Sequence, residues 1–171
     1  MLMNTMNMHQ RGVGLMEVLV ALLVLAIGVL GFITLQYRAV EATTESGYRV
    51  QAINIARDMA ERIRVNRGAI DTYEDLLKGT AAKQIADTTD CATTDCTISE
   101  LAAYDVKQVS QKAQDMGMTM SNMPCQGNSD DRYCVYVAWG DTAATDGADA
   151  GNCTNGAAYV TTSTCLIMEV Y

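Results

Sequence analysis

The stretch Arg11-Gly12-Val13-Gly14-Leu15-Met16-Glu17 leads directly into an uncharged apolar run from Val18 to Leu35. The 18 residues of this run span roughly 27 Å as a helix, close to the hydrocarbon thickness of a bilayer. A carboxylate is unfavourable there, by about 2.5 to 3.5 kcal/mol at the membrane centre and by less near the boundary. Glu17 therefore needs a charged partner or a function, and it is the most informative residue of the chain.

The residues that flank the apolar run indicate its orientation. Arg11 precedes the run, and a positive flank favours an N-terminus in the cytoplasm with everything after Leu35 outside. A cleavable secretory signal would have a shorter apolar core followed by a small-x-small site, whereas Gln36-Tyr37-Arg38 follows this run. A plain uncleaved anchor accounts for the length and orientation of the run, but it does not account for Glu17.

Composition excludes several classes of function. The 171 residues carry a formal net charge of -8, and without a Lys/Arg cluster such a chain is a poor candidate for binding nucleic acid or anionic lipid. After residue 12 the sequence has no histidine, no Gly-x-Ser-x-Gly and no Gly-rich phosphate loop, so we expect no enzyme and no cofactor. The residues that follow the apolar run suffice for one modest domain.

All six cysteines lie in the second half of the chain. An even number of cysteines after a membrane-targeting segment indicates disulfides in an oxidising compartment such as the periplasm. Many pairings are possible, and we expect the sequential one: Cys91 with Cys96, Cys125 with Cys134, and Cys153 with Cys165. The spacing lacks Cys-x-x-Cys and the only histidine, His9, precedes the apolar run, so zinc is not expected.

Acidic residues in the loop from Asp141 to Cys153 raise the question of calcium. Asp141, Asp146 and Asp149 lack the alternating spacing of an EF-hand loop. We therefore expect a solvated connector and no metal site.

A second helical segment continues beyond the apolar run. No proline occurs from Gln36 to Val65, and apolar residues recur there at three- and four-residue steps. Opposite charges four residues apart indicate an exposed face, and Asn66-Arg67-Gly68 ends the segment. We expect one helix from about Val13 to Val65, with the apolar stripe Ala52, Ile55, Ala56, Met59 and Ile63 and the ion pairs Glu45–Arg49, Arg57–Glu61 and Asp58–Arg62.

The remainder of the chain predicts an α+β head. A short helix is expected over Thr72–Leu77, a loop over Thr80–Thr97, and a longer helix from the capping box of Thr97 and Glu100 to a stop at Gly117. Runs rich in β-formers then predict strands over Met118–Met123, Tyr133–Trp139, Ala157–Thr162 and Cys165–Tyr171. We expect these strands to form a small antiparallel sheet packed on the long helix.

Gly12, the segment Val13 to Glu17 and the apolar run together resemble the class III signal of type IV pilins. The resemblance implies that a prepilin peptidase cuts between Gly12 and Val13 and methylates the new amine of Val13. Glu17 would then be the fifth mature residue, and in a filament core its buried carboxylate would need a cation such as the Val13 amine of a neighbouring subunit. Thr34 departs from the pattern, because many major pilins carry a helix-kinking proline at this position.

Three further segments resemble PilV-type minor pilins: A-I-G-V-L-G at Ala26–Gly31, D-M-A-E-R-I-R-x-N-R within Ala56–Arg67, and L-A-A-Y-D at Leu101–Asp105. The resemblance implies a type IV pilin fold in four parts. These parts are a leader over residues 1–12, a transmembrane or filament-core helix over 13–36, a periplasmic helix over 37–66 and a disulfide-bonded head over 67–171.

The same resemblance implies a function. A minor pilin of this type helps to initiate assembly of a type IV pilus, enters it at the tip, and supports twitching motility and adhesion. The implied partners are other minor pilins, the major pilin, the prepilin peptidase, the inner-membrane assembly platform and a tip adhesin. The implied location is the inner membrane, crossed once, and then the extracellular pilus. Two alternatives remain open: a minor pseudopilin of type II secretion, and a non-assembling single-pass membrane protein with a periplasmic domain.

Overall fold

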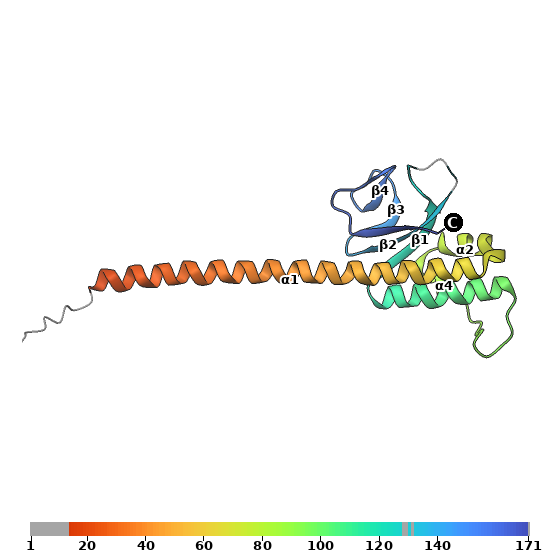
Figure 1. The fold of residues 1–171 in the computed structure, drawn as a ribbon, viewed down its shortest axis with the longest axis horizontal. Coiled ribbons are helices and arrows are strands. Elements are labelled where there is room, and N and C mark those ends of the chain that lie inside the picture. The colour runs from red at the N-terminus through yellow and green to blue at the C-terminus, as the bar shows by residue number, and fades with distance from the viewer. Residues whose placement is uncertain (1–13, 128–129, 131, 171) are drawn as a thin grey trace, which may run out of the picture. The chain divides into compact units, whose positions relative to one another are not determined.

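The computed structural model describes residues 14–127, 130 and 132–170, and it divides into two compact units, residues 1–44 and 45–171. Helix α1 (Leu15–Val65) belongs to both units (Figure 1). The predicted long helix is therefore confirmed over its described residues.

The described part of the first unit is helical and exposed from Leu15 to Thr44. The most apolar window of α1 has a mean hydropathy of 3.0 and none of it is buried, so by length and composition the helix can cross a membrane. The helix continues through Gly28, Gly31 and Thr34. The hydroxyl of Thr34 donates to the Leu30 carbonyl at 2.8 Å, so its polar group is satisfied within the helix where a proline would interrupt it.

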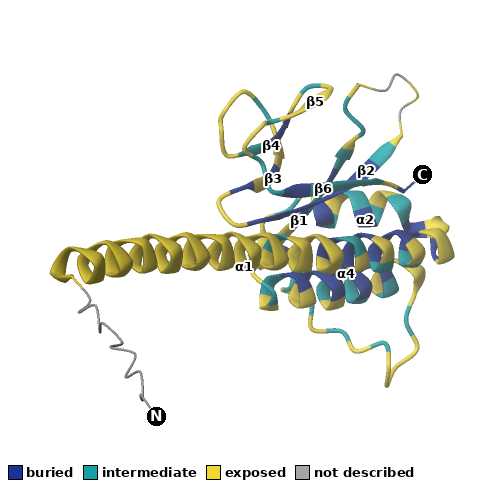
Figure 2. Ribbon diagram, turned by 60° about the vertical axis from the view of Figure 1, so that its left-hand side comes forward, coloured by how far each residue is buried: buried dark blue, intermediate teal, exposed yellow. Residues whose placement is uncertain are grey.

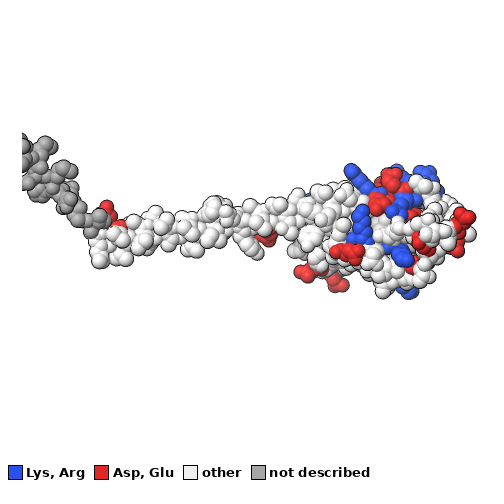
Figure 3. All heavy atoms as spheres, turned by 90° about the horizontal axis from the view of Figure 1, so that it is seen from below, with Lys and Arg blue, Asp and Glu red and all other residues white. Residues whose placement is uncertain are grey.

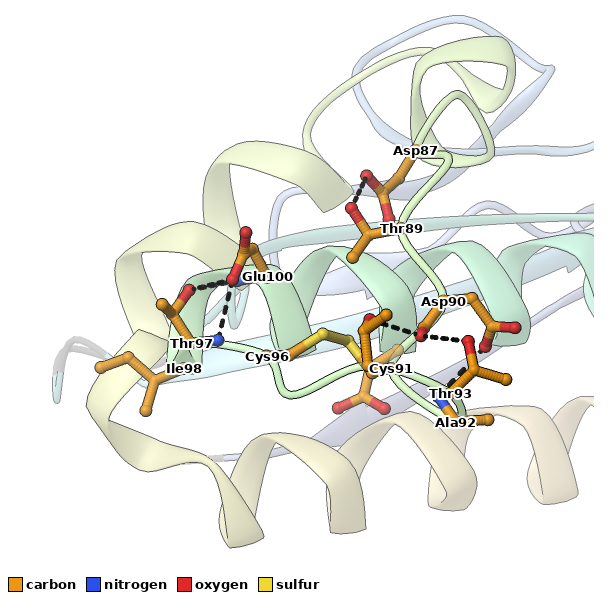
Figure 4. Close-up of a disulfide and its surroundings, with 12 residues drawn as sticks. Asp87, Thr89, Asp90, Cys91, Ala92, Thr93, Cys96, Thr97, Ile98 and Glu100 are labelled. Carbon is orange, nitrogen blue, oxygen red and sulfur yellow. Dashed lines mark hydrogen bonds between the residues drawn. A yellow bond between two sulfur atoms is a disulfide. The ribbon is translucent and has the colours of Figure 1, made fainter.

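In the second unit, α1 contributes one face to a core built with shorter helices. All five residues of the predicted apolar stripe are fully buried or nearly so. A 3-10 turn (Arg67–Ala69) follows, and then α2 (Ile70–Leu77), α3 (Ala81–Gln84) and α4 (Ile98–Asp115). The capping box that starts α4 is confirmed, because Glu100 N–H donates to Thr97 Oγ1 and Thr97 N–H donates to Glu100 Oε2 (Figure 4). Gly117 ends the segment with a φ of 71°, a conformation that favours glycine.

The main sheet contains β1 (Met118–Pro124), β2 (Tyr133–Trp139) and β6 (Cys165–Glu169) in the order β1-β2-β6, antiparallel throughout. Central strand β2 is almost entirely buried (Figure 2). Because side chains alternate across a strand, Val135 and Val137 join the core shared with the helices, whereas Cys134, Tyr136 and Ala138 join a second core on the other face.

The sequence predicted a single sheet, but a second small sheet is present, and the expected strand Ala157–Thr162 contributes only Ala158–Tyr159 to it. It contains β3 (Ala143–Asp146), β4 (Asn152–Asn155) and β5 (Ala158–Tyr159) in that order, with β3 parallel and β5 antiparallel to β4. Its strands are short and polar, so they carry little β signal, and part of it occupies the expected connector Asp141–Cys153. Asp146 Oδ1 accepts hydrogen bonds from Thr154 Oγ1 at 2.6 Å and from Gly156 N–H at 2.9 Å. This carboxylate helps to hold the sheet together.

Three disulfides join the cysteines in sequence order. Cys91–Cys96 closes the loop before α4 (Figure 4), Cys125–Cys134 joins the chain after β1 to β2, and Cys153–Cys165 links β4 to β6. The Cα atoms of the pairs lie 5.6, 5.0 and 5.8 Å apart, within the range that disulfides require. Cys153–Cys165 fastens the second sheet to β6 of the main sheet, and Cys125–Cys134 fastens the end of β1 to β2.

Candidate assembly site

Glu17 lies in the first turn of α1. A carboxylate at this end of a helix interacts favourably with the helix dipole, and the Glu17 N–H donates to the Gly14 carbonyl at 2.9 Å. Within residues 14–127, 130 and 132–170, Glu17 has no ion-pair partner. Gly12 and Val13, the residues of the expected cleavage site, lie outside the described residues. The site that the structure presents is thus a carboxylate without a cation in its own described chain.

An apolar surface follows Glu17 along the helix. Large hydrophobic side chains such as Leu22, Leu25 and Leu30 are 57%, 62% and 66% exposed. On the face drawn in Figure 3, charged side chains gather on the second unit and are sparse along the first. Exposed apolar surface on this scale marks contact with a membrane or with other proteins. In either environment the carboxylate of Glu17 would need a cationic partner.

A second polar cluster lies in the other unit and joins three helices. Arg62 on α1 donates to Asp58 Oδ1 at 2.9 Å and to Asp105 Oδ1 on α4 at 2.6 Å. The hydroxyl of Tyr73 on α2 donates to the other oxygen of Asp105 at 2.5 Å. Asn66 Nδ2 donates to the Ile98 carbonyl at 2.7 Å. We call Asp58, Arg62, Asn66, Tyr73 and Asp105 the helix-clamp network.

The electrostatics of this network favour a structural role. Burial lowers the pKa of the Arg62 guanidinium, but its bonds with Asp58 and Asp105 outweigh burial, so the net shift is upward. Burial and the neighbouring Asp105 carboxylate both raise the pKa of Tyr73. Arg62 therefore stays charged and Tyr73 neutral near pH 7, so neither residue exchanges a proton there.

The structure corrects two expectations about ion pairs and adds one residue. The Asp58–Arg62 pair was expected on a solvated face, but its side chains are only 31% and 29% exposed, because α4 covers them. The expected Arg57–Glu61 pair is replaced by a bond from Arg64 Nη1 to Glu61 Oε1 at 2.9 Å. Sequence reasoning missed Tyr73, whose place opposite Asp105 depends on the turn between α1 and α2. The described residues contain no group of three or more metal-ligating side chains.

Two family models match adjoining parts of the chain. Residues 7–33 match the prokaryotic N-terminal methylation motif, and residues 34–107 match the Tt1218-like model, described as type IV pilin Tt1218. Together they run from residue 7 to residue 107, more than half of the 171 residues. Neither a curated protein nor a solved structure matches the chain.

The fold and the matched segments define the class of protein. A long N-terminal helix packed on small sheets with three disulfides is a pilin-like α+β fold. Over residues 34–107 the chain matches a type IV pilin, and over residues 7–33 it carries the N-terminal methylation motif. Members of this family are structural proteins and not enzymes. Of the helix-clamp network, every residue falls within the matched range 34–107.

Proposed function

We propose that this chain is a minor pilin of the PilV type, which helps to initiate assembly of a type IV pilus and enters it at the tip. The observation that carries the proposal is the exposed apolar part of α1 that follows Glu17, which no other described residue of its unit covers. A helix of this kind suits storage in a membrane and transfer into a filament core. The three segments that resemble PilV-type sequences support the minor-pilin assignment over that of a major pilin.

Processing of the N-terminus is the first step in this proposal. A prepilin peptidase removes the leader, residues 1–12, by cutting between Gly12 and Val13 on the cytoplasmic side, and it methylates the amine of Val13. That amine is the cation that Glu17 of a neighbouring subunit needs once both are buried. Residues 13–36 form the filament-core helix, 37–66 the periplasmic helix and 67–171 the head.

The proposed partners follow from this role. They are other minor pilins, the major pilin, the inner-membrane assembly platform and a tip adhesin. The protein resides in the inner membrane with its head in the periplasm until it joins the extracellular pilus, where it supports twitching motility and adhesion. The location is consistent with the three disulfides, because the periplasm is an oxidising compartment.

Intact-mass measurement of the protein from membranes, with and without the prepilin peptidase, tests the processing step. We expect a chain that starts at methylated Val13 when the peptidase is present and a chain that retains Met1 to Gly12 when it is absent. Retention of Met1 to Gly12 in both strains would contradict the proposal and favour a simple membrane anchor.

A minor pseudopilin of type II secretion is the second candidate, because it would have the same leader, apolar helix and glutamate. Deletion of the gene separates the two candidates. Loss of surface pili and twitching is expected for the pilus protein, whereas loss of exoprotein secretion with normal pili would favour the pseudopilin.

A further inference from the structure

The main sheet has two edge strands, and they differ in whether their outward backbone groups have hydrogen-bond partners. On β1, Gln84 Nε2 donates to the outward carbonyl of Met120 at 2.9 Å. On β6, the Val170 N–H donates to the Tyr133 carbonyl at 3.0 Å. In the antiparallel register of β2 and β6, this bond shows which residues of β6 hydrogen-bond to β2, because bonded and non-bonded pairs alternate along the two strands. Leu166 and Met168 turn their backbone groups toward β2, and the residues between them turn theirs away.

The backbone groups that point away from β2 belong to Cys165, Ile167 and Glu169. No bond from any described part of the chain reaches the N–H or carbonyl group of Ile167, the middle residue of the three. Proteins usually protect an open edge with proline, lysine or a bulge, but β6 reads Cys-Leu-Ile-Met-Glu. Its three central side chains are partly exposed (Figure 2). The strand is an unprotected, largely apolar edge.

Two hollows adjoin this edge: Leu166 lines the first, its neighbour Ile167 lines the second, and Tyr159 lines both. A hollow of about 510 Å³ is lined by Arg49, Tyr159 and Leu166 among others. A second hollow, of about 230 Å³, is lined by Tyr136, Tyr159 and Ile167 among others. Because side chains of a strand point alternately to opposite faces, a strand laid along β6 would direct successive side chains toward the two hollows.

We propose that an extended segment of another protein adds to the outer edge of β6 as an antiparallel strand. Its backbone pairs with the outward groups of Cys165, Ile167 and Glu169, and its apolar side chains enter the two hollows. The unpaired backbone groups select this occupant, because an extended chain presents donors and acceptors at the matching spacing, whereas a helix does not.

Charge at the two ends of the edge specifies the occupant further. The C-terminal end of an added antiparallel strand would lie beside Cys165, where Arg49 lines the hollow. The Arg49 side chain is 65% exposed and lies 3.9 Å from Glu45, so it remains available to a carboxylate. At the other end Glu169 is already bound to Arg132 at 2.7 Å. The partner segment therefore carries a carboxylate at its C-terminal end. A second copy is disfavoured because each chain carries a net charge of -8.

The test uses the full-length protein in detergent micelles, labelled with ¹⁵N, and the synthetic peptide Thr-Val-Val-Val-Val-Thr-Asp as the probe, which presents Val on both faces of the strand. We expect the peptide to shift the amide signals of Cys165, Ile167 and Glu169 and to slow their hydrogen exchange. The same peptide methylated on alternate backbone nitrogens cannot pair as a strand, and we expect it to bind about tenfold more weakly or not at all. This control leaves the protein unchanged.

Two substitutions in the protein complete the test. Ile167→Pro removes an outward N–H and the isoleucine side chain but leaves the ladder bonds of Leu166 and Met168, so it should weaken binding about tenfold without unfolding the sheet. The matched variant Ile167→Thr keeps the N–H and the β-branched shape and should bind within about threefold of the parent protein. Arg49→Gln should remove the preference for the free carboxylate over the C-terminal amide.

Three results would overturn the proposal. Equal binding of the methylated and unmethylated peptides would rule out backbone pairing. Signal changes confined to residues away from β6 would place the peptide elsewhere. A concentration-dependent dimer that Ile167→Pro abolishes would assign the edge to a second copy and not to another protein.

Discussion

The indole N–H of Trp139 donates to Glu45 Oε2 at 3.1 Å, a bond between residues 94 positions apart in the chain. Trp139 ends the central strand β2 and is only 3% exposed. Glu45 is the first residue of the second compact unit. The bond therefore fastens the sheet to α1 where the head begins, and an acceptor for the buried indole N–H is supplied by the helix.

Removing this acceptor should weaken the head. In Glu45→Ala the Trp139 N–H loses its charged acceptor in a nearly buried position, so we expect the free energy of unfolding to fall by about 1 to 2 kcal/mol. Because Trp139 is the single tryptophan, its fluorescence during urea unfolding in detergent measures the change directly. Glu41 pairs with Arg38 on an exposed face, so Glu41→Ala is the control and should change stability by less than about 0.5 kcal/mol. Equal losses in both variants would contradict the assignment.

The helix-clamp network predicts a larger loss. Asp105→Ala leaves the Arg62 guanidinium and the Tyr73 hydroxyl without their shared acceptor, and we expect a loss of about 3 kcal/mol in the free energy of unfolding. Asp115 lies at the exposed end of the same helix, where it accepts from Gln111 Nε2 at 3.0 Å. Asp115→Ala should therefore change stability by less than about 0.5 kcal/mol. A small effect of Asp105→Ala would show that Asp58 and Gln108, which also accepts from Arg62 at 3.1 Å, satisfy Arg62 without Asp105.

Tyr73 makes stability depend on alkaline pH. Burial and the Asp105 carboxylate raise the pKa of Tyr73 above its usual 10.0, so the folded protein keeps the phenol proton when the unfolded chain has lost it. The contribution of Tyr73 is complete below about pH 10 and declines as the pH rises above that value. We expect the free energy of unfolding to fall above pH 10 more steeply than in Tyr73→Phe. Arg62 and Lys78 also have raised pKa values, but both occur in the two proteins, so their effects cancel in the comparison. Parallel pH profiles would contradict the prediction.

The elements that the sequence predicts well depend on local signals. The stripe around Met59, the capping box at Thr97 and the β-rich run Tyr133–Trp139 each carry a period or a cap, and each matches an observed element. In the second sheet only β5 lies within a predicted strand, Ala157–Thr162, and it has two residues, whereas β3 and β4, with four residues each, carry no such signal. The bond from Thr154 to Asp146 and the Cys153–Cys165 bridge hold these strands, and they join residues 8 and 12 positions apart, which no strand or helix period brings together.

The functional residues also differ in whether a local sequence signal predicts them. Glu17 is prominent in the sequence because a carboxylate interrupts an otherwise apolar stretch, which is a local observation. Tyr73 has no comparable signal, because a tyrosine in a short helix has many possible environments. Its role depends on Asp105, 32 residues further along the chain, and only the packing of α2 on α4 brings the two together.

The three disulfides should contribute unequally to stability. Cys153–Cys165 closes a separation of 12 residues in a buried cluster, whereas Cys91–Cys96 closes one of 5 in a partly exposed loop. We expect the double variant Cys153→Ala/Cys165→Ala to lose about 3 kcal/mol and Cys91→Ala/Cys96→Ala about 2 kcal/mol. Urea unfolding of both variants measures the order. A larger loss for the Cys91–Cys96 pair would show that this loop supports α4 more than its exposure suggests.

Glu17→Gln tests the proposed assembly role, because it removes the charge and leaves the shape, the apolar helix and the Gly12–Val13 bond unchanged. If Glu17 pairs with the Val13 amine of a neighbouring subunit, a neutral amide leaves that amine without its counter-ion in the filament core. Breaking such a buried pair costs about 3 to 5 kcal/mol, enough to reduce incorporation by more than about a hundredfold. We expect the variant to be cleaved normally, to remain in the membrane and to be missing from sheared pili, as measured by immunoblotting of the two fractions. Glu41→Gln, in the same helix but beyond the apolar run, is the control and should enter pili at the parental level. Normal recovery of Glu17→Gln in pili would mean that the carboxylate is not paired in the filament and would remove the main physical argument for its role there.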